Sequence, residues 1–415
     1  MSRAGTNVLK EHLLDHVLPW WVSHGLDDAP GVLTGFDNDG GLVTSDRFTW
    51  SQGRWAWLCG ELCDDAAGGR LPLDAAEWRS RCRSTVEFLV RFAVRDDGRT
   101  VFRTTKDGVA VPDAGGEVAT SVFADLFVVL GIAGALRVDP EAPDGWLSVA
   151  EHILATAERS IADRTALSEP YPVPAGFRDL AGPMNLLHAS AELLRARPSA
   201  VATGVRDRAL ATLDADFLGE DSWLEFRPER SVPAQTLLAR HRTPGHLLEL
   251  LWMLVLAEEN AGLPTDLRRY TRLALRALDL GWDREFGGLL RYVDEEGGRP
   301  TGSLLGEQPT RYEALVAQTW DTKLWWVHAD TMVATALLAR LTGSPALGEW
   351  NTRIREYTLA TFPSPTGEWT QVRDRHGDPL NAVVALPVKD PFHIIRALVL
   401  LARLEADVPL EGVAA

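Results

Sequence analysis

The segment at residues 288–297 reads Gly-Leu-Leu-Arg-Tyr-Val-Asp-Glu-Glu-Gly and lies between two stretches whose apolar residues recur at helical spacing, 265–280 and 330–341. It joins a glycine, a short apolar run and an Asp-containing turn that a second glycine closes. Because Asp and Gly tolerate the left-handed backbone of tight turns, the segment predicts a small β-hairpin between helices.

The same pattern occurs twice more, as GVLTGFDNDG at 31–40 and as EWTQVRDRHG at 368–377. The residues around 95–109 predict a further hairpin, since they also combine Asp-Gly turns with β-prone residues. Turns of the form Asp-x-x-Gly are common, so coincidence stays open as an explanation of the repeat. If the repeat is real, the chain consists of helices joined by short hairpins on one rim.

Helical periodicity extends along most of the chain, with the clearest stretches at 118–136, 184–194, 247–256, 265–280, 330–341 and 392–404. These stretches are too many for a four-helix bundle, and they do not alternate with strands as a parallel sheet would require. An all-α toroid or solenoid remains, and helical hairpins with β-hairpins on one rim are typical of an (α/α) barrel. No Pro/Gly/Ser linker interrupts the chain, so we expect residues 1–415 to form a single domain.

The charge balance excludes some partners. The formal net charge is -16, and no basic stripe offsets it, so neither nucleic acid nor a membrane surface is expected to bind. Charged residues near the N-terminus interrupt any signal-peptide core, and the longest apolar run, 247–257, is far shorter than the roughly 20 residues that span a bilayer. The sequence therefore predicts a cytoplasmic protein.

The three cysteines, Cys59, Cys63 and Cys82, are too few and too irregularly spaced for a disulfide framework or a four-cysteine zinc site. Cys59 and Cys63 lie on an apolar helical stretch, where buried packing is the favoured interpretation. No His-Glu-x-x-His motif, phosphate-binding loop or dinucleotide fingerprint is present. We expect no metal and no catalytic cofactor.

Tryptophan is abundant, with 15 residues against five tyrosines. Most must fill the helical walls, but several lie beside polar residues: Trp50 and Trp55 flank Gln-Gly-Arg54, and Trp325-Trp326 precede His328. Indole faces stack on the apolar faces of sugar rings. This clustering favours a polyol ligand.

Two histidines stand where helices are expected to begin. His246 follows Pro-Gly, with Glu249 on the same helical face, where a carboxylate could orient the imidazole. His393 opens the stretch FHIIRAL, with Arg396 one turn later. Each could be a structural residue at a helix start, and that alternative stays open. If both face one cavity, their reference pKa of about 6.5 suits acid–base catalysis.

Around these residues the sequence resembles the N-acylglucosamine 2-epimerase family, whose relatives include cellobiose 2-epimerases and mannose and sulfoquinovose isomerases. The resemblance covers about residues 18–404, and it depends on the order of several loose motifs. These are FTWSQGRWAW at 48–57, SVFADLFV at 121–128, PMNLLHA at 183–189, TPGHLLEL at 243–250, GWDREFGGLLRYVD at 281–294, KLWWVHADT at 323–331, GEW at 367–369 and KDPFHIIRA at 389–397.

The resemblance implies an (α/α)6 barrel whose cavity holds a ring-opened aldose between two catalytic histidines, which His246 and His393 resemble. Glu249 resembles the carboxylate that supports the first histidine, and Arg54 resembles the arginine near O1 and O2 of the sugar. The remaining substrate-pocket positions are Trp50, Asn185, His188, Trp252, Trp326, Asp330 and Arg396. The chain departs from the family in having Asp330 where relatives often have Glu and Val327 where they often have Pro.

The chemistry explains these residue types. Removal of the C2 proton from an open-chain aldose leaves a cis-enediolate, which needs a cation or hydrogen-bond donors at its oxygens. Two histidines on opposite faces of C2 would invert that carbon, whereas one base carrying the proton to C1 would give a ketose. The pairing of His393 with Arg396 resembles the epimerase branches, so we expect a 2-epimerase, with aldose–ketose isomerase as the alternative.

Two other functions remain as alternatives. A glycoside hydrolase on the same barrel would need two carboxylates about 6.5–9.5 Å apart for inversion, and Asp125, Glu249 and Asp330 are the candidates. A non-catalytic binding protein is the other. The expected ligand is a monosaccharide or disaccharide; a nucleotide activator, as in some relatives, and a homodimer are both permitted by the sequence.

Overall fold

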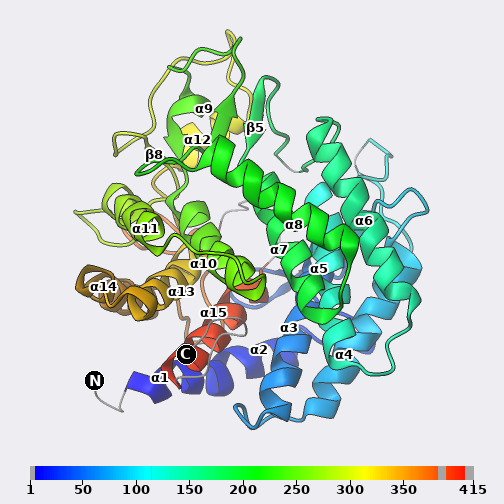
Figure 1. Ribbon diagram of the computed structural model, residues 1–415. Helices are drawn as coiled ribbons and strands as arrows, with labels where there is room; N and C mark the ends of the chain where they lie inside the picture. The colour runs from blue at the N-terminus through cyan, green and yellow to red at the C-terminus, as the bar shows by residue number, and fades with distance from the viewer. Residues whose placement is uncertain (1–4, 114, 170, 382–388, 407–415) are drawn as a thin grey trace.

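The computed structural model describes residues 5–113, 115–169, 171–381 and 389–406. Figure 1 shows long helices arranged around a centre, with the N-terminal helix and the C-terminal helix on the same side. Among the described residues, six helices form an inner ring in which each contacts the next and the last contacts the first. They are α3 (Thr49–Ala67), α5 (Val122–Val138), α7 (Ala181–Ala196), α10 (Pro244–Asn260), α13 (Trp325–Thr342) and α15 (Pro391–Glu405).

An outer layer packs against this ring, one helix against each inner helix. In ring order its members are α4 (Ala75–Phe88), α6 (Gly145–Ala162), α8 (Ala200–Thr212), α11 (Leu267–Gly281), α14 (Pro345–Thr361) and α1 (Gly5–His12). Shorter segments complete the helical part: η1 (Leu13–Val17), α2 (Leu18–His24), η2 (Leu89–Ala93), η3 (Leu213–Phe217), α9 (Leu237–Arg240) and α12 (Arg311–Thr319). The predicted (α/α)6 barrel is confirmed.

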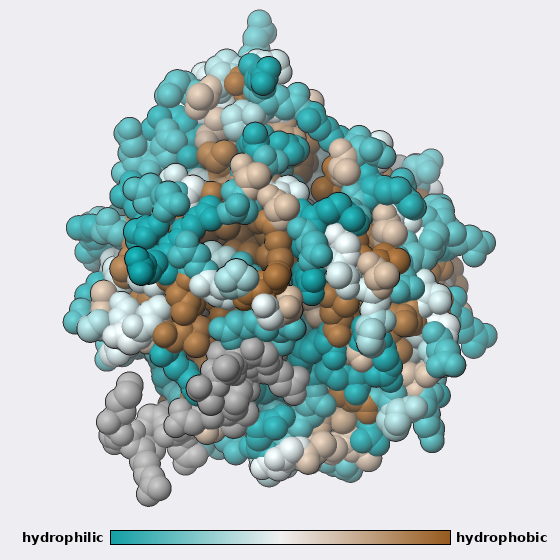
Figure 2. All heavy atoms as spheres, viewed as in Figure 1, coloured by the Kyte–Doolittle hydropathy of each residue, from teal (hydrophilic) through white to brown (hydrophobic). Residues whose placement is uncertain are grey.

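Apolar patterning separates the two layers. Nearly every residue of α5 is buried, as expected for a helix that is apolar on all sides. The outer helix α11 buries a single face whose residues recur every three or four positions: Tyr270, Leu273, Ala274, Ala277, Leu278 and Gly281. The inner helices are therefore enclosed by the outer ones, which present their polar faces to solvent. Figure 2 shows this surface as largely hydrophilic, with apolar side chains mainly in recesses between helices.

Five short antiparallel pairs of strands complete the described part. They are β1 (Gly35–Phe36) with β2 (Leu42–Thr44), β3 (Arg47–Phe48) with β4 (Arg103–Thr104), β5 (Phe177–Asp179) with β6 (Phe226–Pro228), β7 (His241–Arg242) with β8 (Val293–Asp294), and β9 (Lys323–Leu324) with β10 (Val372–Arg373). The strands β3, β5, β7 and β9 each lead directly into an inner helix. They fix where α3, α7, α10 and α13 begin.

The predicted hairpins form in part. Residues 31–40 do give a hairpin, β1–β2. The turn at Asp294 also forms, but its strand β8 pairs with β7, more than 50 residues earlier, rather than with the residues after the turn. Likewise β10 pairs with β9, with only the bridge from Arg373 to Pro379 across its own turn. The strands leading into the inner helices supply the partners that local turn patterns cannot reveal.

Three other observations bear on the sequence predictions. Among the described residues, no helix is long and apolar enough to cross a membrane. Cys59, Cys63 and Cys82 are buried free thiols, as the apolar helix indicated for the first two. The helix predicted from residue 118 begins later, at Val122, because Ser121 is extended and bridges to Ser168.

Candidate active site

A cavity of about 550 Å³ lies at the N-terminal ends of the six inner helices, since each contributes side chains from its first turns. These include Trp50 and Arg54, Phe123 and Phe127, Asn185 and His188, His246 and Glu249, Trp325 and Trp326, and His393 and Arg396. The volume falls within the usual range for small-molecule sites. Helix N-termini carry partial positive charge, so the cavity favours a ligand that develops negative charge.

His246 is the third residue of α10, after Pro244 at the helix start. Its Nδ1 donates a hydrogen bond to Oε1 of Glu225 at 2.7 Å, and Glu225 is only 1% exposed. Burial lowers the pKa of His246, but the adjacent Glu225 carboxylate outweighs burial and leaves that pKa above its usual value. With Nδ1 engaged, Nε2 is the nitrogen available to a ligand, and Glu225 stabilises the protonated form of His246 relative to a free imidazole.

The carboxylate expected beside His246 was Glu249, but the structure places Glu225 there instead. Glu249 accepts a hydrogen bond from Nη2 of Arg396 at 2.6 Å, and Glu225 takes the place expected for it beside His246. The helix carries Glu249 one turn deeper than His246, to the level where Arg396 enters from α15. Glu225 immediately precedes β6, which pairs with the strand before α7, so its proximity is a product of the rim strands.

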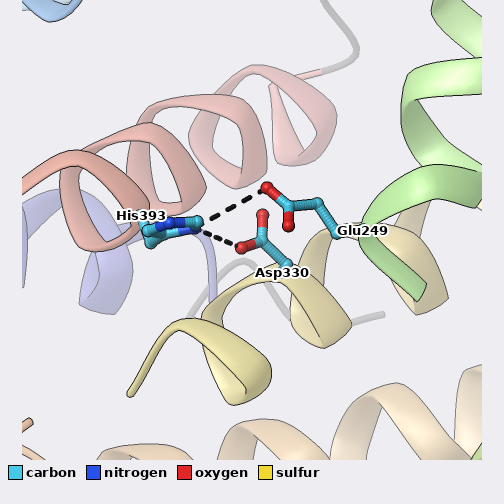
Figure 3. A group of neighbouring side chains, drawn as sticks. All are labelled: Glu249, Asp330 and His393. Atoms are coloured by element: carbon cyan, nitrogen blue, oxygen red, sulfur yellow. Dashed lines mark hydrogen bonds and ion pairs between the residues drawn. The ribbon is translucent and has the colours of Figure 1, made fainter. Parts of the chain in front are cut away.

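His393 lies in a different environment (Figure 3). Its Nδ1 donates to Oδ2 of Asp330 at 2.6 Å, while Oε1 of Glu249 is 3.8 Å away. Its Nε2 is 3.6 Å from Oδ2 of Asp390. Burial, together with the nearby charge of Arg396, lowers the pKa of His393 to about 3. His393 is therefore neutral near pH 7, with its proton on Nδ1 and a free lone pair on Nε2.

Arg396 holds this cluster together. Its Nη2 donates to Glu249 and to Asp330, both at 2.6 Å, and lies 3.0 Å from Nδ1 of His393. Glu249, Asp330 and His393 have the residue types and spacing of metal ligands. A guanidinium nitrogen nevertheless lies within hydrogen-bond distance of all three, where a bound cation would compete with it.

Arg54 approaches from α3 on another side of the cavity. Its Nη1 forms an ion pair with Asp390 at 3.1 Å. The guanidinium lies 4.0 Å from the ring centre of Phe127 and 5.0 Å from that of Trp50. The rings of Trp50 on α3 and Phe127 on α5 fix the orientation of the guanidinium. Arg54 is therefore a pre-positioned cation beside His393.

Both histidines contact one indole ring. Trp326 stacks on His246 with 5.0 Å between ring centres and lies 5.9 Å from His393. His188 also lines the cavity, and burial lowers its pKa to about 3, so it is neutral. Asn185 lines the cavity one turn earlier on α7.

The structure thus brings nine of the eleven residues singled out from the sequence to the cavity wall. Trp252 and Asp330 are instead placed behind that wall: the Trp252 ring lies 4.8 Å from the Arg396 guanidinium, and Asp330 bonds to Arg396 and His393. Sequence reasoning missed Glu225 and Asp390. Asp390 had a local signal, because an Asp before Pro at a helix start is a typical N-cap, and it does accept from the Phe392 amide.

The arrangement disfavours the hydrolase alternative. Asp125 accepts both the backbone N–H and the hydroxyl of Thr100 at 2.7 Å and is not part of the cavity wall. The interacting carboxylate oxygens of Glu249 and Asp330 lie within 4.8 Å of each other, around a single guanidinium. They do not flank a glycosidic bond at the separation that inversion requires.

An acid–base enzyme built on an (α/α)6 barrel is the class that this fold and site define. Residues 31–397 match the sequence model of the N-acylglucosamine 2-epimerase (GlcNAc 2-epimerase) family, and the chain belongs to that family. It is therefore an enzyme of the isomerase class.

Individual relatives agree. The N-acylglucosamine 2-epimerase of Bos taurus is 27% identical over 407 residues, which cover 93% of this chain and 87% of the relative. That of Mus musculus is 28% identical over 419 residues, with 94% and 89% covered. A solved cellobiose 2-epimerase from Bacillus thermoamylovorans superposes with a TM-score of 0.73 at 15% identity over 97% of this chain and 100% of that one. A D-mannose isomerase gives 0.68 at 16% identity, covering 96% and 98%. At such identities these two structures establish the fold alone.

Proposed function

We propose that this enzyme epimerises C2 of a ring-opened aldose, with His393 and His246 exchanging the C2 proton on opposite faces of a cis-enediolate. The observation that carries the proposal is the pairing of a neutral and a protonation-prone histidine against one indole, Trp326. A base and an acid are then present in one cavity at the same pH.

In one direction, Nε2 of neutral His393 takes the C2 proton. The C–H electron pair forms the C1–C2 double bond, and the carbonyl oxygen gains the negative charge. The Arg54 cation and the converging helix N-termini stabilise that charge. Protonated His246 then delivers its Nε2 proton to the other face of C2, the carbonyl re-forms, and C2 is inverted. The reverse reaction uses the two histidines in exchanged roles.

The reaction needs no metal in this proposal. Arg396 lies among Glu249, Asp330 and His393 and neutralises the carboxylates that a cation would otherwise bind. We also propose a cytoplasmic enzyme, a location supported by three buried free thiols, and a single domain whose closed helical ring spans α3 to α15. A homodimer is compatible with the acidic surface.

Proton NMR in deuterated buffer tests the proposal. N-acetylglucosamine, N-acetylmannosamine, mannose, glucose and cellobiose are each incubated with the purified enzyme, with and without ATP, and with His246→Ala and His393→Ala. We expect deuterium at C2 and a C2 epimer with the wild type, and loss of the epimer with either variant. His152→Ala, at an exposed histidine, is the control. Full activity in both site variants would contradict the proposal, and a ketose product would indicate the isomerase instead.

A further inference from the structure

Arg291 differs from the other cationic side chains that line the cavity. Arg54 is paired with Asp390, Lys389 with Glu368, and Arg396 with Glu249 and Asp330. Arg291 is only 7% exposed, yet within the described part of the chain no carboxylate lies at ion-pair distance from it.

The neutral contacts of Arg291 fix its position. Its Nη1 donates to Oγ1 of Thr319 at 3.1 Å, and its guanidinium lies 4.8 Å from the ring centre of Tyr292. Its backbone N–H donates to the carbonyl of Thr322. The hydrogen bond to Thr319 and a further side-chain hydrogen bond to Tyr292 use only some of its five N–H donors. Arg291 lines the cavity wall, where its other donors can meet a ligand.

The wall that carries Arg291 is separate from the core of the barrel. A second apolar cluster, whose members include Phe177, Phe226, Tyr292 and Val316, joins β5, β6, α9 and α12. These elements gather at the top of Figure 1. From α12, Tyr312 and Leu315 also line the cavity. The two histidines contact Trp326 of α13, whereas Arg291 lines the cavity beside Tyr292 and Thr319.

A buried guanidinium without a counter-ion is unfavourable, because desolvation of the charge is not offset by a partner. Neutral donors would suffice to bind the neutral hydroxyl groups of a sugar, and burying them costs less free energy than burying a charge. Arginine is well suited to carboxylate and phosphate oxygens, to which it donates two parallel hydrogen bonds. The deep carboxylates Glu225, Glu249 and Asp390 are each already paired with a cationic or protonatable group.

We propose that Arg291 forms a subsite for an acidic oxygen group, a carboxylate or a phosphate, carried by the sugar at a carbon other than C1 or C2. The ligand then supplies the counter-ion that the protein lacks, and the tyrosine-lined wall surrounds it. This inference rests on the proposed function for the orientation of the sugar, but the affinity of the subsite does not depend on turnover.

Isothermal titration calorimetry of the full-length enzyme with mannose, mannuronate and mannose 6-phosphate measures the subsite directly. We expect one of the two acidic sugars to bind roughly tenfold to a hundredfold more tightly than mannose, the gain typical of hydrogen bonds between charged groups. Comparison of mannuronate with mannose 6-phosphate shows whether the subsite prefers a carboxylate or a phosphate. If neither acidic sugar binds more tightly than mannose to the wild type, the proposal is wrong.

Variants locate the effect. Arg291→Met should remove the preference for the acidic sugar, and Arg291→Lys should keep part of it. Arg284→Met, at an exposed arginine paired with Asp279, is the matched control and should keep the full preference. A preference that survives in a folded Arg291→Met overturns the proposal. If circular dichroism shows that this variant does not fold, Arg291→Gln replaces it with the same criterion. Deuterium exchange at C2 is followed separately, so failure of the epimerase proposal is distinguishable from failure of the subsite.

Discussion

At the scale of single residues, burial and charged neighbours set the pKa values of the two histidines apart. Glu225 faces His246 at 2.7 Å and raises its pKa against the effect of burial. His393 also meets a carboxylate, Asp330, but burial and the charge of Arg396, 3.0 Å from its Nδ1, lower its pKa to about 3. Identical side chains in one cavity are thus prepared for different roles.

Replacement of Glu225 by glutamine tests this difference. Glu225→Gln keeps the shape of the side chain but removes the charge, so the pKa of His246 should fall and the alkaline limb of the kcat profile should move to lower pH. At pH 8 we expect kcat to fall roughly tenfold to a hundredfold, as for the loss of a hydrogen bond to a charged group. Glu220→Gln, at an exposed surface pair with Arg272, is the control. An unshifted pH profile in the folded variant would show that Glu225 does not tune His246.

The sequence predicted the residue types of the site better than their partners. His246, His393 and Arg396 could be selected because helix-start patterns and the family resemblance both point to them, and Arg54 because of its flanking tryptophans and the resemblance. The pairing of His246 with Glu225 could not, because it depends on the antiparallel strands β5 and β6, which are 49 residues apart in the chain at their Phe177 and Phe226 positions.

At the scale of elements, glycines let α3 and α5 approach closely. A methyl group on Gly53 would lie 2.1 Å from the carbonyl oxygen of Phe127, and one on Gly131 would lie 2.8 Å from the carbonyl oxygen of Gly53. This contact sets the position of Phe127, whose ring holds Arg54. The packing of two inner helices therefore controls a residue of the site.

Gly53→Ala should destabilise the protein by roughly 1–3 kcal/mol, because the backbone of α5 must shift to accept the methyl group. Urea denaturation measures the change. Gly348→Ala is the matched control: it lies within helix α14, nothing lies within 4 Å of the added methyl group, and it should stabilise by about 0.5–1 kcal/mol. Equal effects of the two substitutions would contradict the close-packing explanation.

The six helical stretches predicted from periodicity all correspond to helices, five in the inner ring and α11 outside it. The inner helix α3 has weak periodicity because polar residues such as Gln52, Glu61 and Asp65 lie among its buried positions. The pairing of the strands could not be predicted from the sequence, because a two-residue strand has almost no sequence pattern of its own. Local patterns therefore specify the helices, while closure of the ring specifies the strand pairing.

At the scale of the whole molecule, a buried ionic network closes the ring at the end opposite the cavity. Glu61 of α3 forms ion pairs with Arg137 of α5 at 2.7 Å, Arg195 of α7 at 2.9 Å and Arg403 of α15 at 2.6 Å. These three cations hold the pKa of Glu61 well below its usual value in spite of burial. The network joins α15, at the end of the chain, to α3.

Buried histidines should make the molecule sensitive to acid. The folded-state pKa is about 3 for His188 and His393 and about 4 for His241 and His328, against 6.5 in the unfolded chain. Above pH 6.5 both states are neutral; as pH falls from 6.5 towards 4, only the unfolded state binds protons at these sites. The free energy of unfolding should then decrease, by up to about 1.4 kcal/mol per pH unit for each histidine.

Urea denaturation at pH 7.5, 6 and 5 measures this slope. Burial raises the pKa of Asp125 to about 7 and that of Asp179 to about 6, and the pKa values of His246, Asp330, Glu368, Glu258 and Glu259 are raised as well. These groups bind protons more readily in the folded state, so the slope should be shallower than the four histidines alone would give. Because the pKa of Glu61 is lowered in the folded state, protonation of Glu61 in the unfolded chain decreases stability further at pH values below its unfolded-state pKa. Stability that rises between pH 6.5 and 5 would contradict the assignment of neutral buried histidines.

The central claim is that two histidines act on opposite faces of C2, and epimer-specific exchange tests it most directly. Each C2 epimer of the turned-over sugar is incubated in deuterated buffer with His246→Ala and with His393→Ala, and deuterium at C2 is measured by NMR. We predict that each variant exchanges only the epimer whose C2 proton faces its remaining histidine, so that the two variants have opposite preferences. Exchange of the same epimer by both variants would mean that one base serves both faces, and the two-histidine account would be wrong.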